Sequence, residues 1–146
     1  MDKLCREWLS FAETDLGIAQ HLYDRYRPRP LEIVCYHCQQ SAEKAIKAVI
    51  IAMGAQDGMP KPHDLSFLLN QIKNMTEIDE RYYDYADTLT PYGVSVRYPS
   101  ELEIEDRHAE TALRYASELL AWAKSICTGS DEREDCLIRD ADRTDH

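Results

Sequence analysis

The chain has 146 residues and a net charge of −10, with five glycines and six prolines. This length fits a single domain that can bury a core without disulfides or metal. Such acidity excludes general binding to the phosphate backbone of nucleic acids, although a local basic site remains compatible with it. No run of 18 apolar residues is present, so we expect no transmembrane helix.

The start of the chain and its cysteines suggest a cytoplasmic protein. Met1, Asp2 and Lys3 lead directly into an amphipathic run, which is unlike a signal peptide. The five cysteines are odd in number and irregularly spaced. We therefore expect reduced thiols, most of them buried, and a cytoplasmic location.

Apolar residues at helical spacing predict an all-α protein, an up-down antiparallel bundle of about five helices over residues 1–127. The predicted helices cover approximately residues 3–26, 31–53, 65–75, 79–89 and 103–127. Pro28 and Pro30 separate the first two helices, and Gly54 is suited to end the second. Residues 128–146 form an acidic tail that we expect to be flexible, with at most a short helix near 136–141.

The first predicted helix carries a charged residue among its apolar positions. Its apolar stripe consists of Leu4, Trp8, Phe11, Ala12, Ala19, Leu22 and Tyr23, and Asp15 falls on the same stripe. A carboxylate there needs a partner or access to solvent. Asp15 is either a structural partner of another helix or a supporting member of a polar site.

The second predicted helix, residues 35–53 in particular, has two unlike faces and suits a central position in the bundle. The apolar arc holds Val34, Cys35, Cys38, Ala42, Ala45, Ile46, Val49, Ala52 and Met53. The opposite side gathers Tyr36, Gln40, Glu43, Lys44 and Lys47. This polar side is the predicted functional surface.

Cys35 and Cys38 have the spacing of a metal or redox motif, but their context differs. They follow no predicted strand and lie on the apolar arc. A zinc site needs two further ligands, and the sequence holds no second CxxC and no HxxxH pair. We therefore predict buried structural cysteines, with no metal and no cofactor.

Two further segments have both structural and functional interpretations. Asp64 can cap the next helix, while His63 beside it could join Lys44 and Lys47 in receiving an anion at a helix N-terminus. Arg97 and Tyr98 could offer a guanidinium to a phosphate and a ring to a base, or could simply pack the end of the bundle. Catalytic triads and phosphate-binding glycine loops are absent from the sequence.

The last predicted helix repeats alanine at close intervals. Ala109, Ala112, Ala116 and Ala123 permit close helix approach, either to the second helix or to a second subunit.

Several of these residues, taken in order, resemble the HEPN domain family, named for its occurrence in higher eukaryotes and prokaryotes and for presumed nucleotide binding. The resemblance spans about residues 4–127 and depends on Trp8, Asp15, the segment CYHCQQSAEKAIKA at 35–48, HDL at 63–65 and RYP at 97–99. It implies a helical bundle that usually dimerises and is similar to the helical domain of kanamycin-type nucleotidyltransferases. Many such proteins are encoded beside a minimal nucleotidyltransferase, and some of these pairs act as toxin and antitoxin.

One branch of the family consists of ribonucleases that use an Arg, four to six intervening residues and a His. After Arg97, the corresponding positions hold Leu102, Glu103 and Ile104, and Arg107 directly precedes His108. Only Arg139 and His146 have the spacing, and they lie in the acidic tail outside the resemblance. The domain therefore lacks the motif of the ribonuclease branch.

These observations favour a homodimeric, non-catalytic subunit that binds a nucleotide and acts with a separate nucleotidyltransferase. Lys44 and Lys47 would contact phosphate, His63 and Arg97 would complete the anion site, and Tyr98 would stack on a base. Four residues would support this site: Asp15, Gln40, Glu43 and Asp64. The alternatives are a metal-independent ribonuclease toxin with a non-standard site, and a protein that serves only dimerisation and partner binding.

Overall fold

The computed structural model describes residues 1–55, 64–93 and 103–144, with side chains up to residue 129. Within these ranges the chain forms five α-helices and one 3-10 turn and no strand, which confirms the predicted all-α fold. The elements are α1 (Lys3–Arg25), α2 (Leu31–Ala52), α3 (Leu65–Asn70), α4 (Glu80–Leu89), η1 (Thr90–Gly93) and α5 (Asp106–Thr144).

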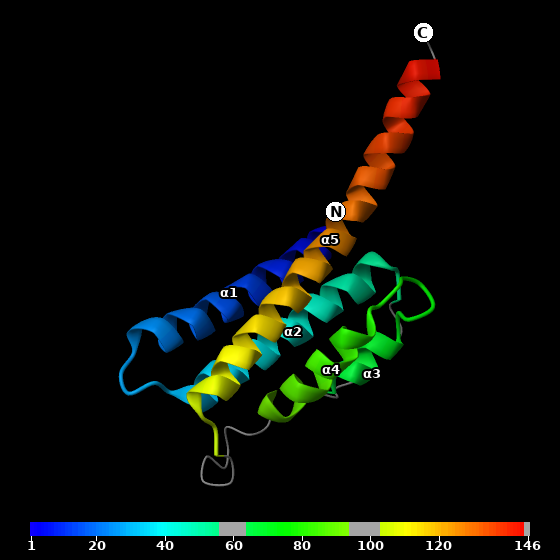
Figure 1. Ribbon diagram of the computed structural model, residues 1–146. Coiled ribbons are helices and arrows are strands. Elements are labelled where there is room, and N and C mark those ends of the chain that lie inside the picture. Colours follow the sequence, from blue (N-terminus) through cyan, green and yellow to red (C-terminus); the bar gives the residue numbers. More distant parts are fainter. Residues whose placement is uncertain (56–63, 94–102, 145–146) are drawn as a thin grey trace.

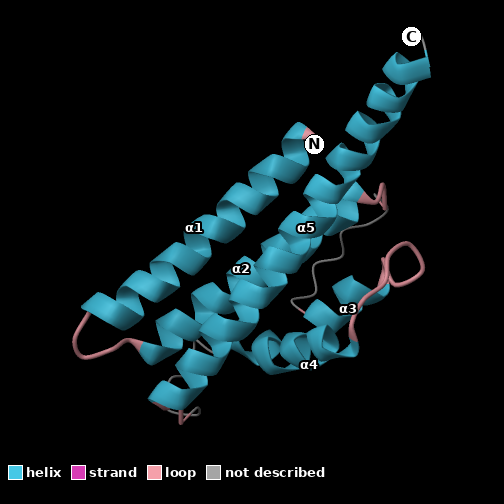
Figure 2. Ribbon diagram, turned by 45° about the horizontal axis from the view of Figure 1, so that its top comes forward, coloured by secondary structure: helices cyan, strands magenta, loops and turns pink. Residues whose placement is uncertain are grey.

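The helix α2 is the centre of the bundle, as its broad apolar arc predicts. It packs against α1 and α5 along most of its length and also contacts α3, α4 and η1 (Figure 1). α1 runs antiparallel to both α2 and α5, while the short helices α3 and α4 lie together on the other side of the bundle (Figure 2). A helix surrounded in this way must bury side chains around most of its circumference.

The ends of the helices are fixed by local side-chain chemistry. Asp2, Asp64 and Asp79 each accept backbone N–H bonds at the start of α1, α3 and α4, which confirms the predicted cap at Asp64. Gly54 follows α2 with a φ of 75°, the left-handed conformation that favours glycine after a helix. The predicted boundaries of α2 and α4 are accurate to about one residue.

The alanines of α5 lie inside the subunit. Ala109, Ala112, Ala116 and Ala123 are fully buried, and α5 packs chiefly against α2. Small side chains allow the two helix backbones to approach closely. The structure therefore shows the first of the two expectations for these alanines, close packing against the second helix.

The buried face of α1 is rotated from the predicted stripe. Its core residues are Cys5, Leu9, Ala12, Ala19 and Tyr23, whereas Leu4 and Phe11 are 48% and 57% exposed. Helix α1 carries apolar residues over more than half of its circumference, but α2 and α5 cover only one side of it. The apolar pattern alone does not show which part of the circumference faces the core.

The lengths of two helices, α3 and α5, also differ from the prediction. α3 ends at Asn70 rather than near residue 75, although the expected inward residue Ile72 is still buried. α5 continues through Thr144, whereas the prediction ended it near 127 and allowed at most a short helix near 136–141. A glycine such as Gly129 costs a helix only about 1 kcal/mol relative to alanine, and many residues after it have good helix propensity.

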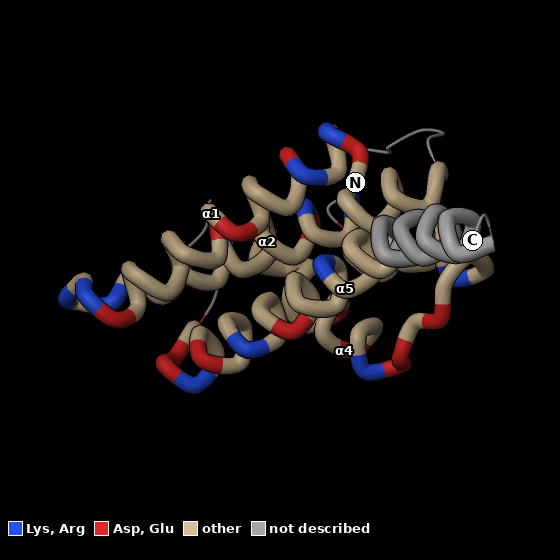
Figure 3. Tube along the Cα trace, turned by 90° about the horizontal axis from the view of Figure 1, so that it is seen from above, with Lys and Arg blue, Asp and Glu red and all other residues tan. Residues whose placement is uncertain are grey.

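Charged residues of both signs alternate around the outside of the described bundle (Figure 3). Positive and negative positions are therefore interspersed along the described helices. None of the described helices combines the length and apolar character needed to cross a membrane.

Candidate binding site on the α1–α2 face

Asp15 is the centre of the candidate site. This α1 residue is only 8% exposed, and its two carboxylate oxygens face two different residues of α2. Oδ1 lies 3.0 Å from Nδ1 of His37, and Oδ2 lies 2.5 Å from Nζ of Lys44. The predicted structural pairing of Asp15 with another helix is therefore confirmed. A charge-assisted contact to each oxygen offsets much of the cost of removing the carboxylate from water.

Ser41 joins the same helix pair beneath this ion pair. Its hydroxyl is fully buried and donates a hydrogen bond of 2.7 Å to the backbone carbonyl of Ala12. His37, Ser41 and Lys44 follow one another at intervals of four and three residues, so they share one face of α2. That face contacts α1, and these polar contacts fix how the two helices align.

Lys47 extends the polar surface one turn further along α2. Its ammonium nitrogen lies 5.2 Å from the centre of the Trp8 ring on α1. An ammonium group at this distance over an indole is attracted by the negative face of the ring. Trp8 therefore orients Lys47 on the same face of α2 as Lys44, one turn away.

We define the basic cluster as Asp15, His37, Lys44 and Lys47. It contains two lysines and one carboxylate, so one positive charge is not neutralised within it. On a chain with a net charge of −10, this local excess is a suitable place for an anion.

A second polar feature lies where η1 crosses α2. Gln39 is fully buried, and its Oε1 accepts a hydrogen bond of 2.7 Å from Nε2 of Gln40. Its own Nε2 is buried and has no hydrogen-bond partner among the residues that the structure describes. A Cβ on Gly93 would lie 2.8 Å from Cδ of Gln39, so the buried end of the Gln39 side chain would have to shift to admit it.

The prediction that Glu43 lies on the exposed polar side of α2 is wrong. It is only 6% exposed. The residue lies one position away from Lys44 on α2, and a step of 100° turns it from the α1 side towards the interior. Gln40, by contrast, is partly exposed next to Gln39.

The remaining predicted site residues are distributed as follows. Asp64 caps α3, with its Oδ1 accepting from the backbone N–H of Ser66 at 3.0 Å and of Phe67 at 3.3 Å. Its carboxylate therefore has a structural task. His63, Arg97 and Tyr98 lie outside the described residues, so their predicted part in the site stays a prediction.

The two cysteines of the CxxC sequence are buried in the core of α2, as predicted. Burial, with a smaller contribution from Glu32, raises the pKa of the Cys35 thiol to about 12. Burial also raises the pKa of Cys38. Protonated thiols are poor nucleophiles and poor metal ligands. In the part of the chain that the structure describes, no three His, Cys, Asp or Glu residues gather in a way that could hold a metal ion.

Sequence inspection missed four contributors to this region: His37, Ser41, Gln39 and the Trp8 ring. The spacing of His37, Ser41 and Lys44 was a usable signal, since it places a polar row on one face of α2. The burial of Gln39 could not be predicted from the neighbouring residues in the sequence, because it depends on η1 packing against α2.

The fold and the basic cluster together define a small all-α bundle whose largely buried central helix carries polar side chains towards α1. The family model of the HEPN domain matches residues 5–126, so the chain belongs to the HEPN domain family. A search of curated proteins found no match.

Solved structures share the fold over most of the chain. TT1696 from Thermus thermophilus is 25% identical, with a TM-score of 0.71 over 86% of this chain and 99% of its own. ST0689, described as an archaeal HEPN homologue, is 24% identical, with a TM-score of 0.66 over 86% of this chain and 98% of its own. A HEPN domain protein from Thermotoga maritima, tm0613, is 26% identical, with a TM-score of 0.53 over 91% and 98% of the two chains.

Proposed function

We propose that this HEPN domain protein is a non-catalytic subunit that binds a phosphate-bearing nucleotide at the basic cluster. The observation that carries the proposal is a pair of lysines one turn apart on α2 of a strongly acidic chain: Lys44 contacts Asp15 beside His37, and Lys47 lies over the Trp8 ring. The lack of the Arg–His motif within the domain supports a non-catalytic role.

The cluster can accept a phosphate without being dismantled. An ammonium group has three N–H donors, and Asp15 occupies one donor of Lys44. The side chain of Lys44 is 26% exposed, so its remaining donors can reach an anion at the surface. Lys47 supplies the second cation, and Asp15 keeps the first in place.

The sequence-based expectation adds four residues to this site. His63 and Arg97 would complete the phosphate contacts, and Tyr98 would stack on the base. Gln40 would border the site from α2. These roles are part of the proposal and await their own variants.

A thermal-shift panel tests ligand binding directly. Purified protein is melted with mono-, di- and triphosphates of each nucleoside, with inorganic phosphate as the control for simple anion binding. A specific ligand at a concentration of 100 times its Kd should stabilise the fold by about 2.7 kcal/mol. If no nucleotide raises the melting temperature above the phosphate control, nucleotide binding by the isolated chain is contradicted.

The proposed partner is a separate minimal nucleotidyltransferase, with which the chain would form a toxin–antitoxin type of module. Its support is the family resemblance. Co-expression with the product of the neighbouring gene, followed by affinity capture and light scattering, should yield a complex of defined mass. Separate elution of the two proteins at micromolar concentration would contradict the partnership.

A surface on α1 favours a second role, formation of a homodimer. Leu4, Phe11 and Ile18 are exposed and repeat every seven residues, so they form one apolar row along α1. The row is symmetric about Phe11, which suits antiparallel contact with a second copy around a twofold axis. Phe11→Glu should give a monomer in light scattering, whereas Phe67→Glu, at an exposed residue of α3, should leave the mass unchanged.

A further inference from the structure

The sulfur atoms of Cys5 and Cys127 form a contact that neither the fold nor the proposed site explains. They lie 3.2 Å apart, although 121 residues separate the two cysteines in the sequence. Cys5 belongs to the first turn of α1, and Cys127 belongs to α5. Both side chains are buried.

The geometry requires little movement to join the two sulfurs. A disulfide bond measures about 2.05 Å, so the pair has to approach by roughly 1 Å. Sγ of Cys5 also lies 3.4 Å from the carbonyl oxygen of Ala48 on α2, so the thiol sits where three helices meet. That packing holds Cys5 beside Cys127.

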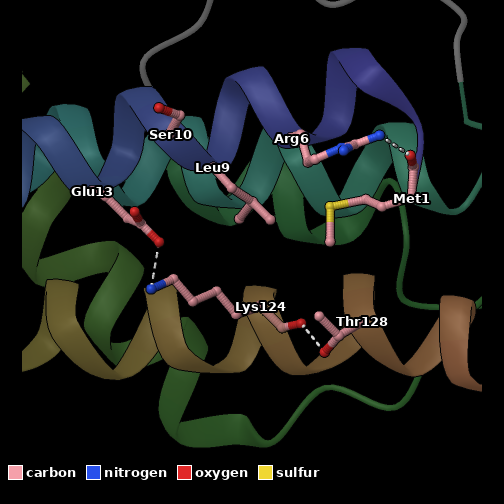
Figure 4. Close-up of a pocket in the computed structure, with 7 residues that line it drawn as sticks. All are labelled: Met1, Arg6, Leu9, Ser10, Glu13, Lys124 and Thr128. Atoms are coloured by element: carbon pink, nitrogen blue, oxygen red, sulfur yellow. Dashed lines mark hydrogen bonds and ion pairs between the residues drawn. The ribbon is translucent and has the colours of Figure 1, made fainter.

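A pocket of about 290 Å³ lies between α1 and α5 (Figure 4). Its lining includes Arg6, the neighbour of Cys5, and Thr128, the neighbour of Cys127. Lys124 of α5 reaches across it to Glu13 of α1, at 2.5 Å. Neither cysteine is among the lining residues, so a small oxidant reaches the two buried thiols when α1 and α5 separate locally beside this pocket.

We propose that Cys5 and Cys127 are an oxidisable dithiol that a small peroxide converts into an intramolecular disulfide. One sulfur, as the thiolate, attacks a peroxide oxygen. The O–O bond breaks, and a sulfenic acid and one molecule of water result. The second sulfur then attacks the sulfenic sulfur, the S–O bond breaks, the S–S bond forms and a second water leaves. The two thiols lose two electrons and two protons, and hydrogen peroxide is reduced to two waters.

The other cysteine pair does not share this arrangement. Cys35 and Cys38 lie one turn apart on the same helix, so a bond between them would join no separate elements. A Cys5–Cys127 bond would instead tie α1 to α5 and close nearly the whole domain in one loop. Long closed loops restrict the unfolded chain most, so the oxidised protein should melt at a higher temperature than the reduced one.

The test is a peptide map of the full chain. Reduced protein is treated with hydrogen peroxide, alkylated under denaturing conditions, digested without reductant and analysed by mass spectrometry. We expect a cross-linked peptide pair containing Cys5 and Cys127 that lacks two hydrogen atoms. The same sample should migrate faster in a denaturing gel until dithiothreitol is added, and its melting temperature should be raised.

Matched variants separate the two cysteine pairs. Cys127→Ala should abolish the faster-migrating form and the rise in melting temperature, whereas Cys35→Ala combined with Cys38→Ala should keep both. The map of the wild-type protein decides the question even if a variant does not fold. Alkylated Cys5 and Cys127 after peroxide treatment, or a bond that maps to Cys35 and Cys38, would overturn the proposal.

Discussion

The two long neighbours of α2 are held to it by different chemistry. On the α5 side, fully buried alanines such as Ala112 and Ala116 bring in no side-chain polar group. On the α1 side, Asp15 pairs with His37 and Lys44, and Ser41 donates to the carbonyl of Ala12.

This difference separates the two tasks of the central helix. A seam of small apolar side chains is specified by shape and tolerates little added volume. A seam that contains ions has directional contacts that a charged ligand can share. The α5 side therefore maintains the fold, and the α1 side is where we place binding.

The largest expected effect tests the apolar seam. Ala116→Leu adds volume to a fully buried position of α5 and should lower the free energy of unfolding by about 3 kcal/mol. Ala121→Leu is the control, because Ala121 is exposed on the same helix and its replacement should change stability by less than about 0.5 kcal/mol. Urea unfolding measures both. Similar midpoints for the two variants would show that α5 does not fit closely against α2.

The contact of η1 with α2 gives the next effect. Gly93→Ala forces its new Cβ against the buried Gln39 side chain and should cost about 2 kcal/mol. Gly17→Ala places the same methyl group in open space within α1, where it should stabilise the protein by about 0.5–1 kcal/mol. The two thermal melts should therefore shift in opposite directions. A stabilised Gly93→Ala protein would contradict the close approach of η1.

The ionic seam should respond to loss of its carboxylate charge. Asp15→Asn leaves Lys44 and His37 without their charged partner and should cost about 1–2 kcal/mol in chemical unfolding. Glu13→Gln is the comparison, because the Glu13–Lys124 pair is about half exposed and surface pairs contribute only about 0–1 kcal/mol. Equal losses of stability in the two variants would show that the contacts of Asp15 contribute no more than an ordinary surface ion pair.

Alkaline pH tests the buried apolar arc of α2. Burial raises the pKa of Cys35 from 9.0 to about 12, so the folded protein keeps a thiol that the unfolded chain ionises above pH 9. Stability should therefore be unaffected below pH 9 and fall as the pH rises towards 12, by up to about 1.4 kcal/mol per pH unit for this group. Cys38 and Tyr92, whose pKa values burial also raises, add in the same direction.

Urea unfolding at a series of pH values measures this slope. Cys35→Ala should flatten it, and an unchanged slope in that variant would assign the alkaline loss to other groups.

The sequence predicted most of the fold because its boundaries are encoded locally. The prolines after α1, Gly54 after α2 and the aspartates before α3 and α4 act within a few residues of their position. The continuation of α5 through Thr144 was not predicted, because the composition of a polar, acidic segment is compatible with both a helix and a flexible tail.

The site was predicted in part. Lys44 and Lys47 were identified from the polar side of α2, and Asp15 from its place among apolar residues, but its partners were not. The residues that contact Asp15 depend on how α1 is rotated about its axis. The exposure of Leu4 and Phe11 shows that the apolar pattern of α1 does not determine this rotation. The burial of Gln39 and Glu43 likewise depends on how the chain packs around α2.

Calorimetric titration of three proteins with the most stabilising nucleotide tests the central claim most directly. The basic cluster predicts that Lys47→Glu weakens binding at least about tenfold, a loss of about 1.4 kcal/mol. Lys73→Glu makes the same charge change at an exposed position after α3 and should bind like the wild-type protein. Equal affinity in all three proteins, or an equal loss in both variants, would contradict binding at the α1–α2 face.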